Sequence, residues 1–318
     1  MAIYGDTSGN LVDRQHGKNQ RLRLDNGVGG DAFGDAEELH DRSRGGRDLL
    51  IGGANAVVNN LFGDADAMLD GSRGGKDTLA GGAHATFNNL FGDAFFMAGD
   101  TRGGKDLVAG GVGAFDNTLH GDARFMLDHA RGGDDLLVGG AGATSNTLYG
   151  DAWNMSGAAR GGNDTLIGAA NSTNNLYGDA QALAGTAVGG NDRLIGGRGT
   201  DLMWGDAAEV APGATTGADT FVFGPHGGDD SIFDFRHSDG DRIDVSAYGI
   251  RSLADMAITQ SGGDARIGLA PPDHGGFLGL LSHIGGFGGG GSDSVTLVGV
   301  QANTLQASDF IFAGHHAG

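Results

Sequence analysis

Apolar residues along this chain come in short groups that recur at a regular interval. One group follows an aspartate, as in Thr78-Leu79-Ala80, and the other precedes a Gly-Asp pair, as in Asn89-Leu90-Phe91. Each group is β-prone, is bounded by glycine and is too short to bury a core alone. Copies stacked about 4.8 Å apart would form a continuous core. The pattern therefore predicts an all-β fold, a β-solenoid with two short strands per coil.

Two polar landmarks set the length of the coil. Eight Gly-Asp pairs run from Gly5-Asp6 to Gly205-Asp206, at intervals of 29 residues five times and then 28 and 27. A second landmark, Arg-Gly-Gly-x-Asp, starts at Arg44, Arg73, Arg102, Arg131 and Arg160, and persists without its arginine at Gly189-Gly190-Asn191-Asp192. We therefore expect about eight coils over residues 1–210.

Two further columns follow from the same period. The position four residues after the Gly-Asp aspartate carries Leu39, Met68, Met97, Met126, Met155 and Leu183. We expect a third buried ladder there, because methionine fills irregular space. Before the Gly-Asp pairs stand Asn59, Asn88, Asn117, Asn146 and Asn174. Asparagine can hydrogen-bond to its copy in the next coil, so this side predicts an amide ladder.

Composition narrows the class of protein. Glycine accounts for 65 of 318 residues and proline for 4, without the period of collagen. The 22 aromatic residues argue against a core of stacked rings. Cysteine is absent, which excludes disulfides and thiolate zinc sites. The net charge of −20 would repel nucleic acid and anionic membranes, and no apolar run is long enough to span a membrane.

The motifs resemble a known family. The run Gly196-Gly197-Arg198-Gly199-Thr200-Asp201-Leu202-Met203-Trp204 matches the nonapeptide Gly-Gly-x-Gly-x-Asp-x-U-x of RTX, or haemolysin-type, calcium-binding repeats. The second half of that motif recurs in six coils. The segments Gly217–Phe223 and Gly227–Phe235 are similar to the closing part of serralysin-type proteases. This resemblance differs from the usual pattern, because RTX coils close in 18 residues and these take 29.

The resemblance implies Ca²⁺ as cofactor, a β-roll-like fold and secretion to the outside of the cell. It also implies a β-rich C-terminal domain over residues 211–318 that caps the coils and contains an uncleaved signal for the type I secretion machinery. The predicted metal ligands are Asp48, Asp77, Asp106, Asp135, Asp164, Asp192, Asp201, Asp219 and Asp230, with Gly46, Gly75, Gly104, Gly133, Gly162 and Gly190 shaping the turns.

Electrostatics gives an independent reason for a cation. Stacked carboxylates about 5 to 8 Å apart repel by on the order of 1 kcal/mol per pair. Calcium takes six to eight oxygen ligands and fits glycine turns better than magnesium does. In the alternative interpretation, the arginines from Arg44 to Arg160 neutralise the aspartates. For the Gly-Asp aspartates, such as Asp64, we expect capping bonds to backbone N–H groups, or pairing with those arginines, more than direct ligation.

No enzyme signature is present. The sequence lacks His-Glu-x-x-His, Gly-x-Ser-x-Gly and a phosphate loop, so we expect no catalytic activity. His40, His84, His120 and His129 lie at different phases of the repeat, which predicts solvated loop residues.

The predicted role is structural. Repeats begin at residue 3, so the first coil would present open strand edges. We expect self-association through this uncapped coil, giving a calcium-dependent filament, matrix or surface layer, unless the degenerate first repeats act as a polar cap. A glycan- or surface-binding adhesin is the alternative. An ice-binding solenoid is disfavoured, because its threonines, Thr86, Thr118, Thr147 and Thr173, do not all share one phase.

Overall fold

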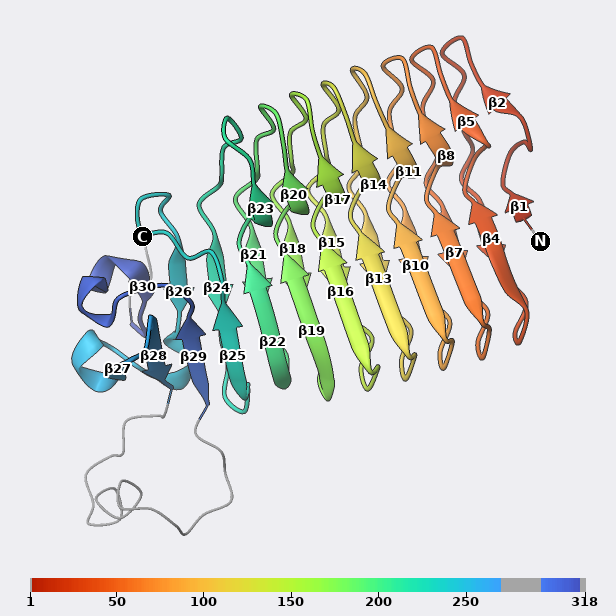
Figure 1. Cartoon of the computed structure of the whole chain (residues 1–318). Helices are drawn as coiled ribbons and strands as arrows, with labels where there is room; N and C mark the ends of the chain where they lie inside the picture. The colour runs from red at the N-terminus through yellow and green to blue at the C-terminus, as the bar shows by residue number, and fades with distance from the viewer. Residues whose placement is uncertain (1, 270–292, 315–318) are drawn as a thin grey trace.

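The chain forms a β-solenoid of about eight coils, each of about 29 residues (Figure 1). The computed structural model describes residues 2–269 and 293–314. Successive coils stack in parallel and in register, so that Leu90 pairs with Leu61 on one side and with Leu119 on the other. The predicted fold class and coil length are confirmed.

Three sheets run along the stack, and we call them sheets A, B and C. Sheet A has twelve strands in the order β1 (Ala2–Tyr4), β4 (Gly29–Phe33), β7 (Val58–Phe62), β10 (Phe87–Phe91), β13 (Asp116–His120), β16 (Ser145–Tyr149), β19 (Ser172–Tyr177), β22 (Gly199–Trp204), β25 (Asp229–Ile232), β29 (Ser294–Leu297), β28 (Asp264–Gly268) and β27 (Ala257–Ser261). Sheet B has eight, β2 (Asn10–Leu11), β5 (Glu38–Leu39), β8 (Ala65–Met68), β11 (Ala94–Met97), β14 (Ala123–Met126), β17 (Ala152–Met155), β20 (Ala180–Leu183) and β23 (Ala207–Val210). Sheet C has ten, β3 (Arg21–Arg23), β6 (Leu49–Ile51), β9 (Thr78–Ala80), β12 (Leu107–Ala109), β15 (Leu136–Val138), β18 (Thr165–Ile167), β21 (Arg193–Ile195), β24 (Thr220–Val222), β26 (Arg242–Asp244) and β30 (Phe310–Ile311).

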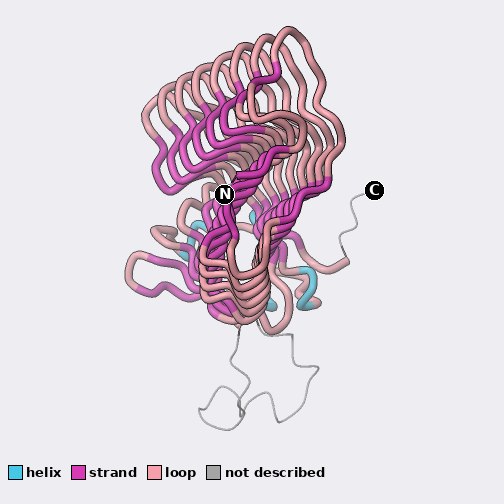
Figure 2. The backbone as a smooth tube through the Cα atoms, turned by 90° about the vertical axis from the view of Figure 1, so that its right-hand side faces the viewer, coloured by secondary structure: helices cyan, strands magenta, loops and turns pink. Residues whose placement is uncertain are grey.

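Each coil therefore holds three strands, and the prediction of two was wrong. The additional strand is the arc after each Gly-Asp pair. In β11, for example, the side chains of Ala94 and Met97 at the two ends of the strand are both fully buried. Figure 2 shows the coils one behind another, with the strands of each sheet superimposed along the stack.

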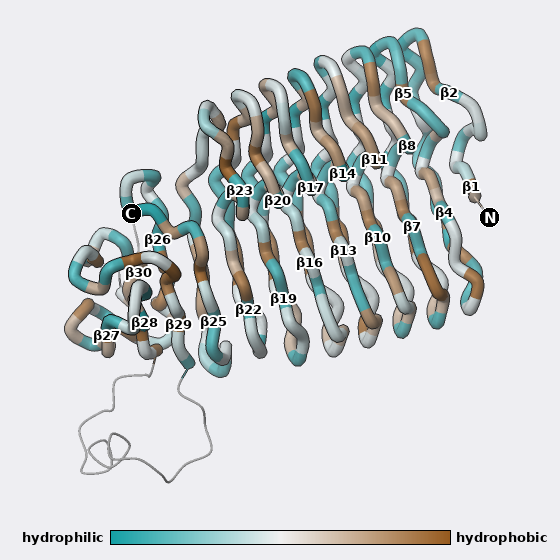
Figure 3. Tube along the Cα trace, in the orientation of Figure 1, coloured by the Kyte–Doolittle hydropathy of each residue, from teal (hydrophilic) through white to brown (hydrophobic). Residues whose placement is uncertain are grey.

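Two aliphatic cores fill the coil. Sheets A and C enclose a column of leucines such as Leu119 and Leu137, all fully buried. Sheet B covers a second core, in which Met68, Met97 and Met126 alternate with alanines. The hydrophobic bands of Figure 3 repeat at the same positions from coil to coil. The predicted third ladder is therefore confirmed, with its own core rather than a share of the first.

Aromatic rings form a separate column beside these cores. Nine rings stack with centroids 4.3 to 4.9 Å apart, one per coil, directly before each Gly-Asp turn or its equivalent. They are Tyr4, Phe33, Phe62, Phe91, His120, Tyr149, Tyr177, Trp204 and Phe233. The few aromatic residues thus form a single column of rings beside the aliphatic cores and not the main core of the fold, because a parallel solenoid needs only one ring per coil to build such a column.

The C-terminal part continues two of the sheets. Sheet B ends at Val210, whereas sheets A and C continue through β24, β25, β26, β29 and β30. Phe221, Ile243 and Phe310 share the first core with the leucines of the coils. The strands β27 and β28 pair antiparallel with each other, and β28 pairs antiparallel with β29, so the two strands extend sheet A (Figure 1). In the described stretches of this part, four short 3₁₀ helices accompany them: Ser246–Tyr248, Leu253–Asp255, Ala302–Thr304 and Ala307–Asp309.

Parts of the expected C-terminal domain, residues 270–292 and 315–318, lie outside the described residues, and so does the very end of the expected secretion signal. Among the helices that the structure describes, none has the length and apolar character needed to cross a bilayer.

Candidate functional site

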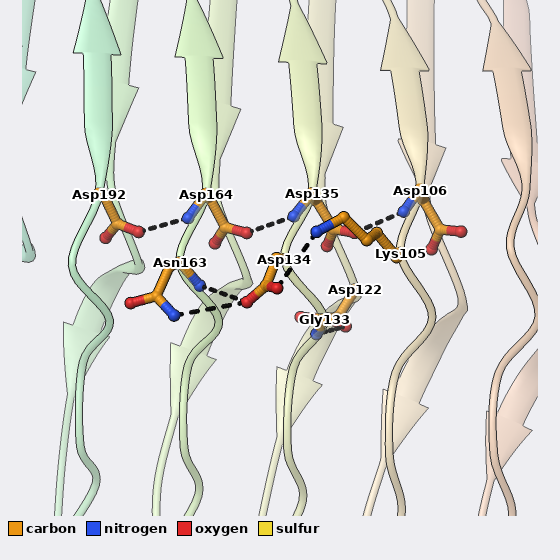
Figure 4. Close-up of polar contacts among 9 residues, drawn as sticks. All are labelled: Lys105, Asp106, Asp122, Gly133, Asp134, Asp135, Asn163, Asp164 and Asp192. Atoms are coloured by element: carbon orange, nitrogen blue, oxygen red, sulfur yellow. Dashed lines mark hydrogen bonds and ion pairs between the residues drawn. The ribbon is translucent and has the colours of Figure 1, made fainter.

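Seven of the predicted ligands form one buried column. They occupy the turn before each strand of sheet C and are at most 4% exposed: Asp48, Asp77, Asp106, Asp135, Asp164, Asp192 and Asp219. From Asp77 onward, each accepts a hydrogen bond from the backbone N–H of the aspartate one coil earlier; Asp106 N–H, for example, donates to Asp135 Oδ1 at 2.6 Å (Figure 4). Asp48, the first of the column, accepts from the backbone N–H of Gln20. Asp241 continues the column by accepting from Asp219 N–H. We call this column the first aspartate column.

One oxygen of every side chain in the first column stays unpaired. The Oδ2 atoms of these seven aspartates are buried and have no hydrogen-bond partner among the described residues. A buried carboxylate oxygen without a partner is costly, because it has lost water and gained nothing in return. The column therefore presents a row of vacant acceptors inside the molecule.

The Gly-Asp aspartates form a second aspartate column beside the first. Its members are also buried: Asp35, Asp64, Asp93, Asp122, Asp151, Asp179 and Asp206. Each accepts a backbone N–H bond from the glycine eleven residues later, as when Gly133 N–H donates to Asp122 Oδ1 at 2.8 Å (Figure 4). The expected bonding to backbone N–H groups is thus present. Four members, Asp35, Asp122, Asp151 and Asp179, also retain an unpaired buried oxygen.

Burial and mutual repulsion raise the pKa values in both columns. The pKa of Asp48 is raised to about 7 by burial and by the charge of Asp35 in the second column. The pKa of Asp219 is raised to about 10 by burial and by Asp192 and Asp206. For Asp122, burial comes first and the charges of Asp135 and Asp151 follow. The two columns therefore destabilise each other's ionised forms across the coil.

Arginine does not neutralise these carboxylates. The side chains of Arg44, Arg73, Arg102, Arg131 and Arg160 are exposed, and within the described residues none forms an ion pair with either column. Lys105 contacts the exposed Asp134 at 3.2 Å instead of the buried Asp106 beside it (Figure 4). Both the arginine alternative and the expected pairing of the Gly-Asp aspartates with arginine are wrong.

The predicted glycines lie where the coils approach most closely. A Cβ on Gly133 would overlap the carbonyl oxygen of Gly104 in the preceding coil, and the same holds for Gly75, Gly162 and Gly190. A Cβ on the preceding glycine, such as Gly132, would overlap the carboxylate of Asp151. The glycine pair therefore lets main-chain carbonyls and carboxylates come together at one turn.

Two predicted ligands lie elsewhere. Asp201 pairs in register with Asn174, and Asn174 Nδ2 donates to Asp201 Oδ1 at 2.6 Å. Asp201 N–H in turn donates to Asp230 Oδ1 at 2.9 Å. The structure therefore places Asp201 and Asp230 at the end of the asparagine column, apart from the other seven ligands. Burial raises the pKa of Asp201 to about 6 and that of Asp230 to about 8.

The amide ladder is present as predicted. Asn88 Nδ2 donates to Asn117 Oδ1 at 2.8 Å, and the bond repeats from coil to coil. Asn88 also accepts from Gly82 N–H at 2.8 Å and donates to the Gly82 carbonyl at 3.1 Å. Every amide is thus saturated by its own turn and its neighbours.

One histidine departs from the expectation of a solvated loop residue. His120 is fully buried in the aromatic column, stacked between Phe91 and Tyr149. Burial and Arg124 lower its pKa to about 3, so its ring is neutral. Its phase gave a signal, since it stands directly before Gly121-Asp122, where other coils carry Phe or Tyr.

The two aspartate columns can accept cations only with help from the main chain. Within the described residues, no three Asp, Glu or His side chains converge on one point as a ready ligand set. A cation there would combine the unpaired Oδ2 atoms with carbonyl oxygens of the glycine turns. No family model matches the chain, and a search of curated proteins finds no match either.

Proposed function

We propose that this chain is a secreted calcium-binding structural protein whose folding is triggered by extracellular calcium. One observation carries the proposal: fourteen buried aspartates in two adjacent columns, with unpaired oxygens and no cationic side chain bonded to them in the described structure. So many buried carboxylates cannot all be ionised at neutral pH without a counter-charge. The role is structural rather than catalytic.

Calcium fits the donor set better than other common cations. The unpaired atoms are all oxygens, which hard cations prefer, and the chain has no cysteine. The Oδ2 atoms of the first column, such as those of Asp106 and Asp135, would hold the ion together with carbonyls of the glycine turns. Calcium accepts an irregular set of six to eight oxygens, whereas magnesium demands a near-ideal octahedron. Bound calcium would supply positive charge and no redox chemistry.

Folding then depends on where the chain is. At low calcium the ionised carboxylates of the two aspartate columns repel one another. The unfolded chain is then favoured, because its aspartates are solvated by water. At high calcium the binding free energy adds to the folding free energy. An extracellular location and export through type I machinery are consistent with this switch and rest on the resemblance to RTX repeats.

Calcium titration followed by circular dichroism tests the proposal. In excess EGTA at pH 7.5 we expect little β signal, and a cooperative gain of β structure as calcium is added. Magnesium at equal concentration should restore much less. The same β spectrum and melting temperature with EGTA and with calcium would refute the proposal.

The proposal includes association at the N-terminal coil. Within the described residues, β1, β2 and β3 each pair with another strand on one side only, and so do β27, β23 and β30 at the other ends of the three sheets. An open row of N–H and C=O groups is a template for another strand. We propose that a second copy pairs there in calcium, as the contact from which a filament, matrix or surface layer grows.

Electron microscopy and sedimentation with calcium and with EGTA test the association. Gly5 N–H donates a hydrogen bond to the carbonyl of Phe33 in the next coil. Backbone N–H groups of successive strand residues point to opposite sides, so the N–H of Ala2 points away from β4 and is free to pair with another strand. Ala2→Pro should weaken association and leave the β spectrum unchanged. Monomers only, in millimolar calcium, would overturn this part alone and leave calcium-dependent folding standing.

The adhesin alternative has one supporting feature. Sheet B carries an outward aromatic patch on three successive coils, with Phe95, Phe125 and Trp153 in edge-to-face contact and Arg124 within 5.3 to 5.8 Å of all three rings. Flanking coils have Ala67 and Gln181–Ala182 in this region. Trp153 is exposed, whereas Phe95 and Phe125 are half-buried. An exposed ring can stack on a sugar, so binding on a glycan array that Trp153→Ala abolishes would favour this role.

A further inference from the structure

A groove rich in arginine lies on the N-terminal half of the solenoid. It encloses about 710 Å³ and runs along the turns that precede the glycine pairs. We call it the arginine groove, and its charged lining residues are Arg14, His16, Arg42, Arg44, Arg73, Arg102, Asp70 and Asp100. A second hollow of about 430 Å³ shares His16, Arg44 and Arg73 with it and adds Arg47 and Lys76. The two form one basic strip.

The arginines of this strip are spaced by the coil. Arg44 pairs with Arg73, and Arg73 with Arg102, through isolated parallel backbone bridges. Successive coils along the solenoid axis therefore each contribute one exposed arginine at the same position. Adjacent coils are separated by about 4.8 Å, the spacing of paired strands. The groove thus presents a row of like charges at a fixed repeat.

These cations have no internal partners. All five groove arginines are exposed, and within the described part of the chain none of them lies within ion-pair distance of a carboxylate. The chain nevertheless has 40 acidic residues against 20 basic ones. Gathering unpaired arginines in an acidic protein costs repulsion that an anionic ligand would relieve.

We propose that the arginine groove binds a linear acidic polysaccharide, which lies along the solenoid axis with its anionic groups on Arg44, Arg73 and Arg102. Guanidinium pairs bidentately with carboxylate and with sulfate-like oxyanions. A single exposed pair contributes little, but a polymer engages several coils at once, and its contacts add up as intramolecular events. This binding is additional to calcium-dependent folding.

The groove suits a sugar chain better than a nucleic acid. No Phe, Tyr or Trp is among its lining residues, whereas single-stranded nucleic acids bind by stacking their bases on aromatic side chains. Asp70 and Asp100 also line it, and their carboxylates can accept hydrogen bonds from the hydroxyl groups of a sugar chain. Duplex DNA carries one charge per about 1.7 Å of axis, and the net charge of −20 on this chain would repel it.

Binding of defined polymers to the full-length chain in calcium tests the proposal. The probes are oligosaccharides of hyaluronan, which carries carboxylates only, and of heparin, which carries sulfates as well. Dextran serves as the neutral polymer and oligo-dT as the nucleic acid. Isothermal titration at 50 and 200 mM salt should show binding of an acidic sugar that weakens with salt, and no binding of dextran or oligo-dT. Comparison of hyaluronan with heparin shows whether carboxylate suffices or sulfate is needed.

Charge-matched variants locate the site. The triple variant Arg44→Gln, Arg73→Gln, Arg102→Gln should weaken binding by about tenfold or more and flatten its salt dependence. The control Arg193→Gln, Arg198→Gln, Arg251→Gln removes the same charge from exposed positions outside the groove and should change affinity less than twofold. Both variants should keep the wild-type β spectrum in calcium.

Three outcomes would overturn the proposal. They are a folded wild-type chain that binds neither acidic sugar, equal losses in the two triple variants, and oligo-dT binding as tight as that of the sugars. If the first triple variant loses β structure, the single variants Arg73→Lys and Arg73→Gln test the site instead, because Arg73→Lys keeps the charge. It should retain most of the binding, whereas Arg73→Gln should lose about threefold.

Discussion

The asparagine column and the aspartate columns solve the same packing problem with different chemistry. Both stack one buried polar side chain per coil, and both accept backbone N–H bonds at a glycine turn. Asn117 donates to Asn146 and to the Gly111 carbonyl, so its amide is saturated. Asp106 and Asp135 have no donor of their own when ionised, and their Oδ2 atoms remain unpaired.

The difference shows why one side is complete and the other is not. An amide is both donor and acceptor, so identical copies can bond to one another indefinitely. A carboxylate only accepts, so identical copies repel unless a cation or a proton lies between them. The amide side therefore sets the register of the stack, and the acidic side makes the stack conditional on its surroundings.

The largest effect should come from pH in the absence of metal. Folding raises the pKa values of Asp151 and Asp48 to about 6 and about 7, above the unfolded value of about 4. Their contribution to stability is complete below pH 4 and is lost as pH rises through 6 and 7. We expect the calcium-free chain to melt highest near pH 4 and to be unfolded by pH 8, because several such groups together exceed a typical stability of about 5 to 15 kcal/mol.

Thermal melts from pH 4 to 8, after removal of calcium and again in its presence, check this. Saturating calcium should reverse the trend, since calcium binds the ionised carboxylates and protons compete with it. A calcium-free melting temperature that rises between pH 4 and 8 would contradict the assignment of the aspartate columns.

The next largest effect should come from giving the amide side an acid. Asn117→Asp removes the donor to Asn146 and places a charge in a fully buried position. We expect a loss of about 3 to 5 kcal/mol in the free energy of unfolding, measured with urea in calcium. Asn175→Asp, in a partly exposed position on the same sheet, is the matched control and should cost less than 1 kcal/mol. Similar losses in both variants would mean that the buried asparagine column tolerates a charge no worse than a partly exposed position does.

The reciprocal change should have opposite signs in the two conditions. Asp106→Asn removes a buried charge, so it should raise stability by about 1 to 2 kcal/mol without calcium and lower the affinity for calcium. Asp116→Asn, on the outward face of sheet A, should show no such dependence on calcium. If Asp106→Asn changed the free energy of unfolding equally in calcium and in EGTA, the first aspartate column would not be a cation-binding site.

The smallest effect concerns the aromatic column, which carries no charge. His120 has no partner for either ring nitrogen among the described residues. His120→Phe should stabilise the chain by about 1 kcal/mol at pH 7, because it keeps the stack and removes unsatisfied polar atoms. Because the pKa of His120 falls on folding, the wild type loses stability as pH drops below about 6.5, and the gain should grow there. A gain that shrinks on acidification would argue against a neutral, buried His120.

Periodicity alone would have corrected one of the sequence-based errors, the column to which Asp201 was assigned. Asp201 stands four residues before its Gly-Asp pair, as Asn174 and Asn117 do before theirs. This spacing assigns Asp201 to the asparagine column, whereas the nonapeptide match had grouped it with the aspartates of the first column. The third strand was harder to predict. Its outward positions vary from Asp66 to Arg124 to Trp153, and no recurring triplet marks it.

The sequence by itself determined which residues stack, because a repeat of constant length brings equal phases together whatever the shape of the coil. It thereby specified the leucine, methionine, asparagine and aspartate columns. Only the tertiary structure decided what each column faces. Asp122 and Asp135 are 13 residues apart, and their columns adjoin because the coil bends sharply at two glycine turns, which also leave Arg131 in solvent. Side-chain direction at a turn depends on how the whole coil closes, and a one-dimensional period carries no information about that closure.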